Sequence, residues 1–339
     1  MTDLPFAPSW QNRFFDLLAR LPVHKYLAMV LITLAVTLAN HLAPWAEGKL
    51  PWGTIDPLQF NFLIWVLVAL VAGDYFLGAA GSALDRFRPA LSVNDETFGR
   101  WRYEFTHLSS RTGWVITGLG ALFSVWGFSF SAPYQRTGAS GVVMYLLAVL
   151  MFGMVFFFFY FLWRMLRMTV HFYDRVERIN IFHLQPLYAF SGLTSAVGIF
   201  FVFAGVLSYL TNVVLNPTPQ VTGFVFFTVI NLTLAVMAFI LPLGGIHRKL
   251  EAAKRREAAE NDRRLEEAYR ELHRRADRLE LAGMSDFHHE IEALVEFRRE
   301  IKALSTWPWG PGTLRNFITA LLLPIVLWVI QQLLQRFFV

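Results

Sequence analysis

The residue with the clearest potential for chemistry is an acidic side chain inside a long apolar stretch. Asp74 lies within the run from Phe60 to Ala80, several residues before that run ends. A charged side chain at the centre of a bilayer costs about 3 kcal/mol on insertion scales, so such residues are retained where they are paired or functional. Asp74 is therefore either a cation or proton site or the ion-pair partner of Arg164 or Arg167, and we favour the ion pair.

The last apolar stretch, from Leu314 to Leu334, is unusual because polar side chains recur along it. Pro324 lies near its middle, where a proline can kink a helix. The polar residues either line a water-filled path or form hydrogen bonds to neighbouring helices, and the second explanation is slightly more common. Together with Asp74, the polar residues that we single out at membrane depth are Asn231, Asn316, Thr319, Gln331 and Gln335.

No group of residues has the spacing of a metal, cofactor or catalytic site. The chain has no cysteine, which excludes thiolate-bound zinc, iron–sulfur clusters and a disulfide framework. His288 and His289 are adjacent and point in different directions on a helix, unlike an i, i+4 ligand pair. The sequence has no phosphate-binding glycine loop and no nucleophile elbow. We therefore expect no enzymatic activity, no metal and no cofactor.

Two loops between apolar stretches combine arginine with aromatic residues and histidine. They either form an anion pocket for a phosphorylated ligand or lipid headgroup, or they fix the topology and anchor the chain at the interface. We favour the topological explanation. The arginines are Arg86, Arg88, Arg100, Arg102, Arg111, Arg175 and Arg178.

The composition identifies the elements that must position these residues as membrane helices. Hydrophobic residues make up 55% of the 339 residues and charged residues only 16%. Seven runs have about the 20 residues that a helix needs to cross a bilayer. We therefore predict an all-α polytopic membrane protein of seven spans, at 26–45, 60–80, 112–130, 142–162, 187–213, 222–243 and 314–334.

The distribution of basic residues predicts the orientation of these spans. If the loops alternate sides, all but Lys49, Arg136 and Arg336 of the 30 Lys and Arg residues fall on one side. Basic residues are retained on the cytoplasmic side, so we expect a cytoplasmic N-terminus, an external C-terminus and a location in the plasma membrane. Topology and anionic lipid headgroups explain the net charge of +5, and we expect no nucleic-acid partner.

The first 25 residues are predicted to form a separate amphipathic helix. Trp10, Phe14 and Leu18 recur at helical spacing and alternate with charged residues such as Arg13 and Asp16. This pattern favours a helix that lies in the cytoplasmic interface, ahead of a six-span bundle over residues 26–245.

Residues 246–306 are rich in charge and predict a helical hairpin in water. Two apolar stripes at heptad spacing can pack against each other over about 265–281 and 287–304, or against a second copy. The preceding basic segment, which contains Lys249 and Lys254, either lies on anionic headgroups or continues the sixth span straight. The residues that we assign to an oligomerisation seam are Leu265, Tyr269, Leu272, Leu279, Ile291, Leu294 and Ile301.

Proline and glycine mark both ends of this hairpin. We expect a bend near Pro242, Gly244 and Gly245, or at Asn261 and Asp262. An elbow from Trp307 to Gly312 then leads into the last domain, residues 307–339. The residues that we assign to gating or hinge motion are Pro242, Gly244, Gly245, Pro308 and Pro324.

Two functions fit this organisation. The first is a homo-oligomeric channel or pore whose last span lines the path and whose hairpin couples the subunits. The second is a membrane-anchored scaffold or sensor whose hairpin recruits a cytoplasmic protein partner. Few ionisable residues lie at membrane depth, which disfavours a proton-coupled pump.

Overall fold

The computed structural model describes residues 5–129, 137–177, 179–215, 221–279, 284–310 and 312–338. Every regular element in these ranges is a helix, which confirms the all-helical fold class. The helices are α1 (Trp10–Ala19), α2 (Lys25–Ala46), α3 (Pro57–Phe87), η1 (Arg88–Ala90), α4 (Asp95–Thr106), α5 (Ser110–Ser129), α6 (Gly138–Asp174), η3 (Gln185–Tyr188), α7 (Ala189–Leu215), α8 (Val221–Ile240), η4 (Leu241–Leu243), α9 (Gly244–Asp277), α10 (Met284–Ala303) and α11 (Thr313–Phe338).

Within the described ranges, six helices are long and apolar enough to cross a membrane: α2, α3, α6, α7, α8 and α11. Helix α5 occupies the predicted third span but is not among them. Its first turn carries the polar residues Ser110, Arg111 and Thr112, which lower its hydropathy. Helices α3 and α6 have 31 and 37 residues, more than the 20 or so that cross the hydrocarbon, so each extends beyond an apolar layer of about 30 Å.

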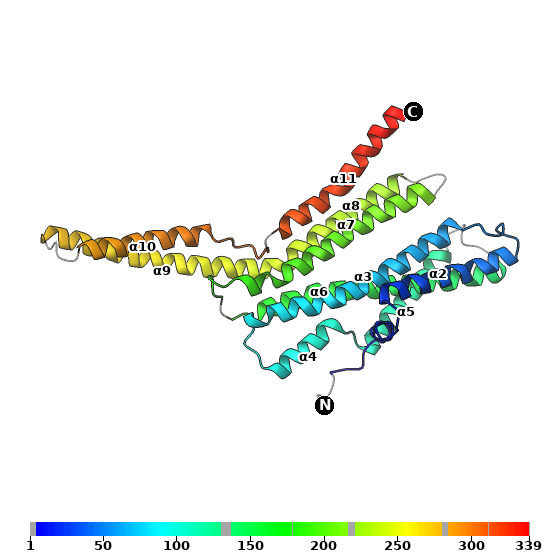
Figure 1. Ribbon diagram of the computed structural model, residues 1–339, viewed down its shortest axis with the longest axis horizontal. Coiled ribbons are helices and arrows are strands. Elements are labelled where there is room, and N and C mark those ends of the chain that lie inside the picture. Colours follow the sequence, from blue (N-terminus) through cyan, green and yellow to red (C-terminus); the bar gives the residue numbers. More distant parts are fainter. Residues whose placement is uncertain are drawn as a thin grey trace.

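Helices α3, α6 and α7 form the middle of the bundle (Figure 1). Helices α2 and α5 pack on one side of this centre, and α8 packs along α7 on the other. The largest buried cluster joins α3, α4, α6, α7, α8 and the start of α9, and a smaller one joins α1, α2, α3 and α6. Helix α11 leaves the bundle at an angle, and Phe317 is the one fully buried side chain in its described part.

Helices α9 and α10 form an arm that projects from one end of the bundle (Figure 1). The chain bends where α8 passes into α9, because the 3₁₀ turn η4 contains Pro242. It does not bend at Asn261 and Asp262, through which α9 continues unbroken. Asn261 is buried between the two helices, and its Nδ2 donates to the Leu294 carbonyl at 3.1 Å, so it joins them instead of ending α9.

A cluster of buried aromatic rings closes the end of the bundle nearest the arm. Phe190 of α7 lies 4.8 Å from Phe87 and 5.5 Å from Tyr173, measured between ring centroids. Phe105 of α4 and Phe172 of α6 meet edge to face at 5.2 Å, a favourable arrangement for aromatic pairs. The rings tie α4 to the ends of α3, α6 and α7, so this loop region belongs to the folded core.

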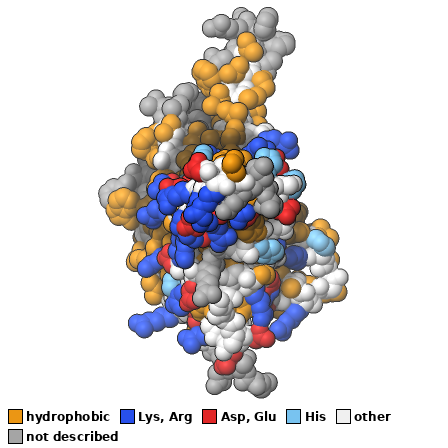
Figure 2. Space-filling view, turned by 90° about the vertical axis from the view of Figure 1, so that its left-hand side faces the viewer, with side chains coloured by type: hydrophobic (Ala, Val, Ile, Leu, Met, Phe, Trp, Pro, Cys, Tyr) orange, Lys and Arg blue, Asp and Glu red, His pale blue; other side chains and the backbone are white. Residues whose placement is uncertain are grey.

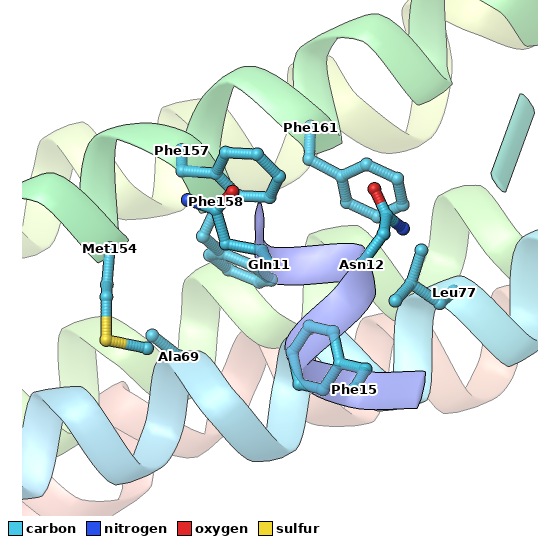
Figure 3. A pocket seen from close by; sticks show the side chains of 10 residues that line it. Gln11, Asn12, Phe15, Ala69, Leu77, Met154, Phe157, Phe158 and Phe161 are labelled. Carbon is cyan, nitrogen blue, oxygen red and sulfur yellow. The ribbon is translucent and has the colours of Figure 1, made fainter. Parts of the chain in front are cut away.

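Helix α1 forms where a helix is expected, but it buries polar side chains. Gln11 and Asn12 are 4% and 5% exposed, whereas Leu17 is 59% exposed. Figure 3 shows Gln11, Asn12 and Phe15 directed toward α3 and α6. Hydrogen bonds explain this orientation, because Asn12 Oδ1 accepts from the Leu108 amide at 3.2 Å and Asn12 Nδ2 donates to the Thr106 carbonyl at 3.2 Å.

Two glycines make room for α1 against the bundle. A Cβ atom added at Gly73 of α3 would lie 3.0 Å from Phe15 Cζ, and one added at Gly113 of α5 would lie 2.8 Å from Ser9 Cβ. Ser9 is also the N-cap of α1, with its side chain accepting from the Asn12 amide. The N-terminal helix is therefore wedged between α3, α5 and α6 and does not merely lie beside them.

Candidate functional site at the base of the helical arm

The base of the arm is the candidate functional site. We define it as the η4–α9 junction together with residues 304–310, which lead from α10 toward α11. Three helices meet there: α6 ends, α9 begins and α10 ends. Four of the predicted hinge residues, Pro242, Gly244, Gly245 and Pro308, lie in or beside this region.

Lys249 of α9 closes the end of α6. Its Nζ donates to the carbonyl oxygens of Tyr173, Asp174 and Val176 at 3.0, 2.8 and 3.1 Å. The last carbonyls of a helix have no partner within the helix and carry partial negative charge, which a lysine ammonium offsets. The arm is thus bonded directly to the longest helix of the bundle.

Lys254 of α9 does the same for α10. Its Nζ donates to the carbonyls of Lys302 and Leu304 at 2.8 and 2.7 Å. The sequence interpretation placed both lysines either on lipid headgroups or on a straight extension of the sixth span, whereas in the structure both bind carbonyls at helix ends. Their partners are 48 to 76 residues away in the chain, so no local pattern identifies these contacts.

A column of stacked rings connects α9 to the elbow. His247 lies 4.1 Å from Trp307 with ring planes 9° apart, and Trp307 lies 4.9 Å from Trp309 at 17°. His247 Nδ1 also donates to the Thr306 carbonyl at 3.0 Å. Trp309 in turn stacks on Phe239 of α8 at 5.7 Å. The elbow therefore rests on the bend between α8 and α9.

The column extends into α11 and α7. Phe239 contacts Phe317 of α11 at 4.3 Å between centroids, and the Gly310 amide donates to Ser191 Oγ of α7 at 3.2 Å. Pro308 lies in the chain between Trp307 and Trp309, whose rings stack on each other. These contacts connect the arm to the end of α6 and to the start of α11.

Most of the predicted seam lies between the two helices of the arm. Leu265 and Ile291 are buried with Ala268, and Leu272 and Leu294 pack against them, while Ile301 is buried nearer the base. Ala268 takes the inward position expected for Tyr269, since residues three and four apart lie on the same face of a helix and the apolar spacing fits either position.

The other two seam residues remain on the surface. Tyr269 is 43% exposed, and Leu279 is 81% exposed just beyond the end of α9, with a φ of 56°. Only these two of the seven seam residues are largely available to a second copy of the chain.

Asp74 forms an ion pair, but with a different partner from those expected. Its Oδ2 lies 2.6 Å from Lys25 Nζ at the start of α2. Arg164 instead donates to the His107 carbonyl at 2.8 Å, and Arg167 lies over the Trp163 ring at 5.4 Å. The pair thus joins the beginning of α2 to the middle of α3.

The other polar residues at membrane depth do not converge. Asn231 is buried where α8 meets Gly205 of α7, and its Nδ2 donates to the Phe227 carbonyl of its own helix at 2.9 Å. Asn316 and Thr319 are exposed on α11, away from the face that carries Phe317. The side chains of Gln331 and Gln335 lie outside the described part of the chain. Pro324 lies within α11, which continues through it as one helix.

The arginines of the two basic loops are largely paired with carboxylates or aromatic rings. Arg102 contacts both carboxylate oxygens of Asp85 at 2.9 and 3.1 Å, and this pairing raises the pKa of Arg102. Arg100 pairs with Glu104 at 3.0 Å, and Arg88 pairs with Asp95. These contacts fit the topological explanation better than a shared anion pocket. Arg178 lies outside the described residues.

The surface of the arm is covered by ion pairs along α9. Glu260 bonds to Arg263 and Arg264, and these hydrogen bonds lower the pKa of Glu260 to about 2. The same kind of pairing with Arg275 and Arg274 lowers the pKa of Glu271. Pairs at i, i+3 and i, i+4 support a solvated helix.

Within the described residues, no three His, Asp or Glu side chains are grouped so that they could hold a metal ion. The base of the arm thus offers helix-capping lysines and stacked rings, which can transmit a displacement. Comparison of the chain with models of protein families, with curated proteins and with solved structures finds no match.

Proposed function

We propose that the protein is a membrane-anchored scaffold or sensor in which α9 and α10 form a cytoplasmic arm that recruits a protein partner. The orientation follows from the positive-inside rule. Figure 2 views the molecule from the end from which the arm projects. Lys and Arg side chains gather over that face, which supports this orientation. The N-terminus is then cytoplasmic and the C-terminus external.

We include α5 as a seventh span. It packs closely along α6, since a Cβ atom added at Gly120 would lie 2.5 Å from the Phe152 carbonyl oxygen, and one added at Gly153 would lie 3.1 Å from Thr117 Cγ2. Small residues that let backbones approach closely are typical of membrane helix pairs. A seventh span also brings α6 into the membrane from the outer side, as the distribution of charge requires.

The observation that carries this proposal is that α9 and α10 pack against each other and that the arm is hydrogen-bonded to the bundle. Most of its apolar seam packs between α9 and α10, and its outer surface carries many charged side chains. Lys249 connects it to α6, and the stacked rings connect it to α11. A projecting, charged and mechanically connected arm suits binding of another protein and transmission of that binding to the membrane helices.

Site-directed photo-crosslinking in membranes of the native host tests this proposal. A crosslinking residue at Arg270, whose side chain is 72% exposed on the arm, should give one discrete adduct with a cytoplasmic protein. The matched control is Leu122 of α5, which is 68% exposed and should react with lipid only. Adducts at Arg270 that contain lipid alone or a second copy of the chain would contradict a scaffold function.

A second candidate function, a homo-oligomeric channel, is favoured by α11. Much of the described surface of this helix is apolar and exposed, including Ile325 and Trp328. Asn316 and Thr319 are exposed on it as well. A ring of copies could cover the apolar surface and turn the polar side chains toward a path.

Native mass spectrometry in nanodiscs distinguishes the two functions. A channel requires a closed ring that weakens when residues 265–304 are removed, and a conductance that is lost in Gln331→Leu or Gln335→Leu. A monomer that is unchanged by the deletion rules out an axial pore and leaves the scaffold.

A further inference from the structure

A pocket on the last four turns of α6 is separate from the base of the arm. It has a volume of about 290 Å³ and is lined by Tyr160, Trp163, Arg164, Arg167, Met168 and His171. These positions recur at intervals of three and four residues, so they share one face of the helix. One wall therefore combines two guanidinium groups, an imidazole and two aromatic rings.

The pocket lies at the level where lipid headgroups are found. The apolar run of α6 extends through Phe159 and Leu162, and the cationic side chains begin at Arg164. Tryptophan and tyrosine concentrate at this boundary, with their rings among the headgroups. Trp163 is 52% exposed toward the surroundings of the bundle, so the pocket can be entered from the lipid.

Its two arginines differ from Arg88, Arg100 and Arg102, each of which pairs with a carboxylate. Arg164 Nη1 donates to the His107 carbonyl, and the Arg167 guanidinium lies over the Trp163 ring. Among the described residues, neither has a carboxylate oxygen within 4.0 Å, whereas Arg100 holds the nearby Glu104 at 3.0 Å. Part of each guanidinium therefore remains available to an external anion.

We propose that this α6 pocket binds the phosphate group of an anionic phospholipid. A guanidinium presents paired donors that match phosphate oxygens, so Arg164 and Arg167 are suited to bind the phosphate through hydrogen bonds. Tyr160 and Trp163, on the hydrocarbon side of both arginines, form an apolar wall for the glycerol and the upper acyl chain. That wall and the position at the interface favour a lipid over a soluble phosphate, which shares the same recognition chemistry. The site does not depend on the function of the arm.

Native mass spectrometry of the full chain tests the proposal. The protein is reconstituted in nanodiscs of phosphatidylcholine with a minor fraction of phosphatidylglycerol, and the lipid retained after release is counted. We expect retention of phosphatidylglycerol over phosphatidylcholine, and a loss of roughly tenfold or more in apparent affinity in R164Q/R167Q. The matched control is R86Q/R100Q, which removes the same charge from exposed arginines at the same end and should retain the lipid.

Two further measurements keep the test decisive. Arg164 also donates to the His107 carbonyl, so the double variant could fail to fold. In that case R167Q alone, which changes only an exposed side chain, should show the loss of phosphatidylglycerol binding. Inorganic phosphate is added to protein in phosphatidylcholine alone and as a competitor to phosphatidylglycerol. Displacement of the lipid by millimolar phosphate would assign the pocket to a soluble anion and overturn the lipid proposal, as would equal lipid retention in the parent and both pocket variants.

Discussion

Lys249 Nζ lies 2.8 Å from the carbonyl oxygen of Asp174, the last residue of α6. The lysine belongs to α9, so one side chain bonds the arm to a helix that crosses the bundle. It also binds the carbonyl of Tyr173, in the last turn of α6, and that of Val176, two residues beyond the helix. These three hydrogen bonds hold the start of α9 against the end of α6.

Replacing Lys249 with Met should loosen the arm without unfolding the bundle. The three carbonyls at the end of α6 lose their ammonium partner, at a cost of about 1 to 2 kcal/mol. Hydrogen exchange should then accelerate in the last turn of α6 and the first turns of α9. Arg248→Met, which removes a charge from the exposed neighbouring position, is the control and should leave exchange unchanged. Equal acceleration in both variants would show that net charge, not the cap, is responsible.

Replacing Asn261 with Leu should stabilise the arm. Asn261 Nδ2 bonds to Leu294, but its Oδ1 is buried without a partner. A buried acceptor without a partner costs about 1 kcal/mol or more, and leucine removes it while adding to the apolar contact. Amides of α10 should exchange more slowly in the variant. Faster exchange would mean that the hydrogen bond to Leu294 outweighs the unpaired oxygen.

Two glycines of α5 should respond in opposite ways to the same substitution. A Cβ at Gly120 would lie 2.5 Å from the Phe152 carbonyl oxygen of α6, whereas a Cβ at Gly118 meets nothing within 4 Å. Gly120→Ala must push α5 away from α6, at a cost of about 2 kcal/mol. Gly118→Ala gains up to about 1 kcal/mol of helix propensity. Thermal unfolding in detergent, compared between the two variants, measures the difference, and equal midpoints would contradict the close packing of α5 on α6.

The ion pairs of the arm predict how its helicity depends on pH. Arg263 and Arg264 lower the pKa of Glu260 in the folded arm to about 2, from an unfolded value of 4.5. A lowered carboxyl pKa means that the stabilisation is complete above about pH 4.5 and is lost as the pH falls toward 2. Circular dichroism should therefore be constant from neutral pH to about 5 and decline below that range. In Glu260→Gln the decline should be smaller, because the titrating group is gone.

The apolar pattern of the sequence predicts the helices well and their partners poorly. Leu265, Ile291 and Leu294 lie at helical spacing, and they do pack inside the arm. The heptad spacing also selected Tyr269, whereas the preceding residue, Ala268, which fits the same face, is buried instead. Lys249 carries no such signal, because its three acceptors are backbone atoms 73 to 76 residues away.

The N-terminal helix illustrates the same limit. Its sequence has the amphipathic pattern of an interfacial helix, and apolar periodicity assigns the buried face to the hydrophobic side chains. Asn12 is buried because the Thr106 carbonyl and the Leu108 amide are available to it, and Gln11 Nε2 donates to Thr117 Oγ1 of α5. Hydrogen bonds to a distant loop thus override the apolar moment, and a single sequence does not show which loop supplies them.

The Lys25–Asp74 pair makes a prediction that separates a structural ion pair from a cation site. Asp74 is 14% exposed, so Lys25→Met leaves a poorly solvated carboxylate without its partner and should destabilise the protein by about 1 kcal/mol or more. The double variant Lys25→Met/Asp74→Asn removes both charges and should recover much of that loss. Thermal unfolding of the two single variants and the double variant measures the coupling. If Asp74 instead served as a cation site, added cations would stabilise the Lys25→Met protein, and the double variant would lose that response. A structural pair gives no cation-dependent shift. In the parent protein the ammonium of Lys25 already occupies the position that a metal ion would take, and in Lys25→Met a single carboxylate offers a metal ion too few ligands.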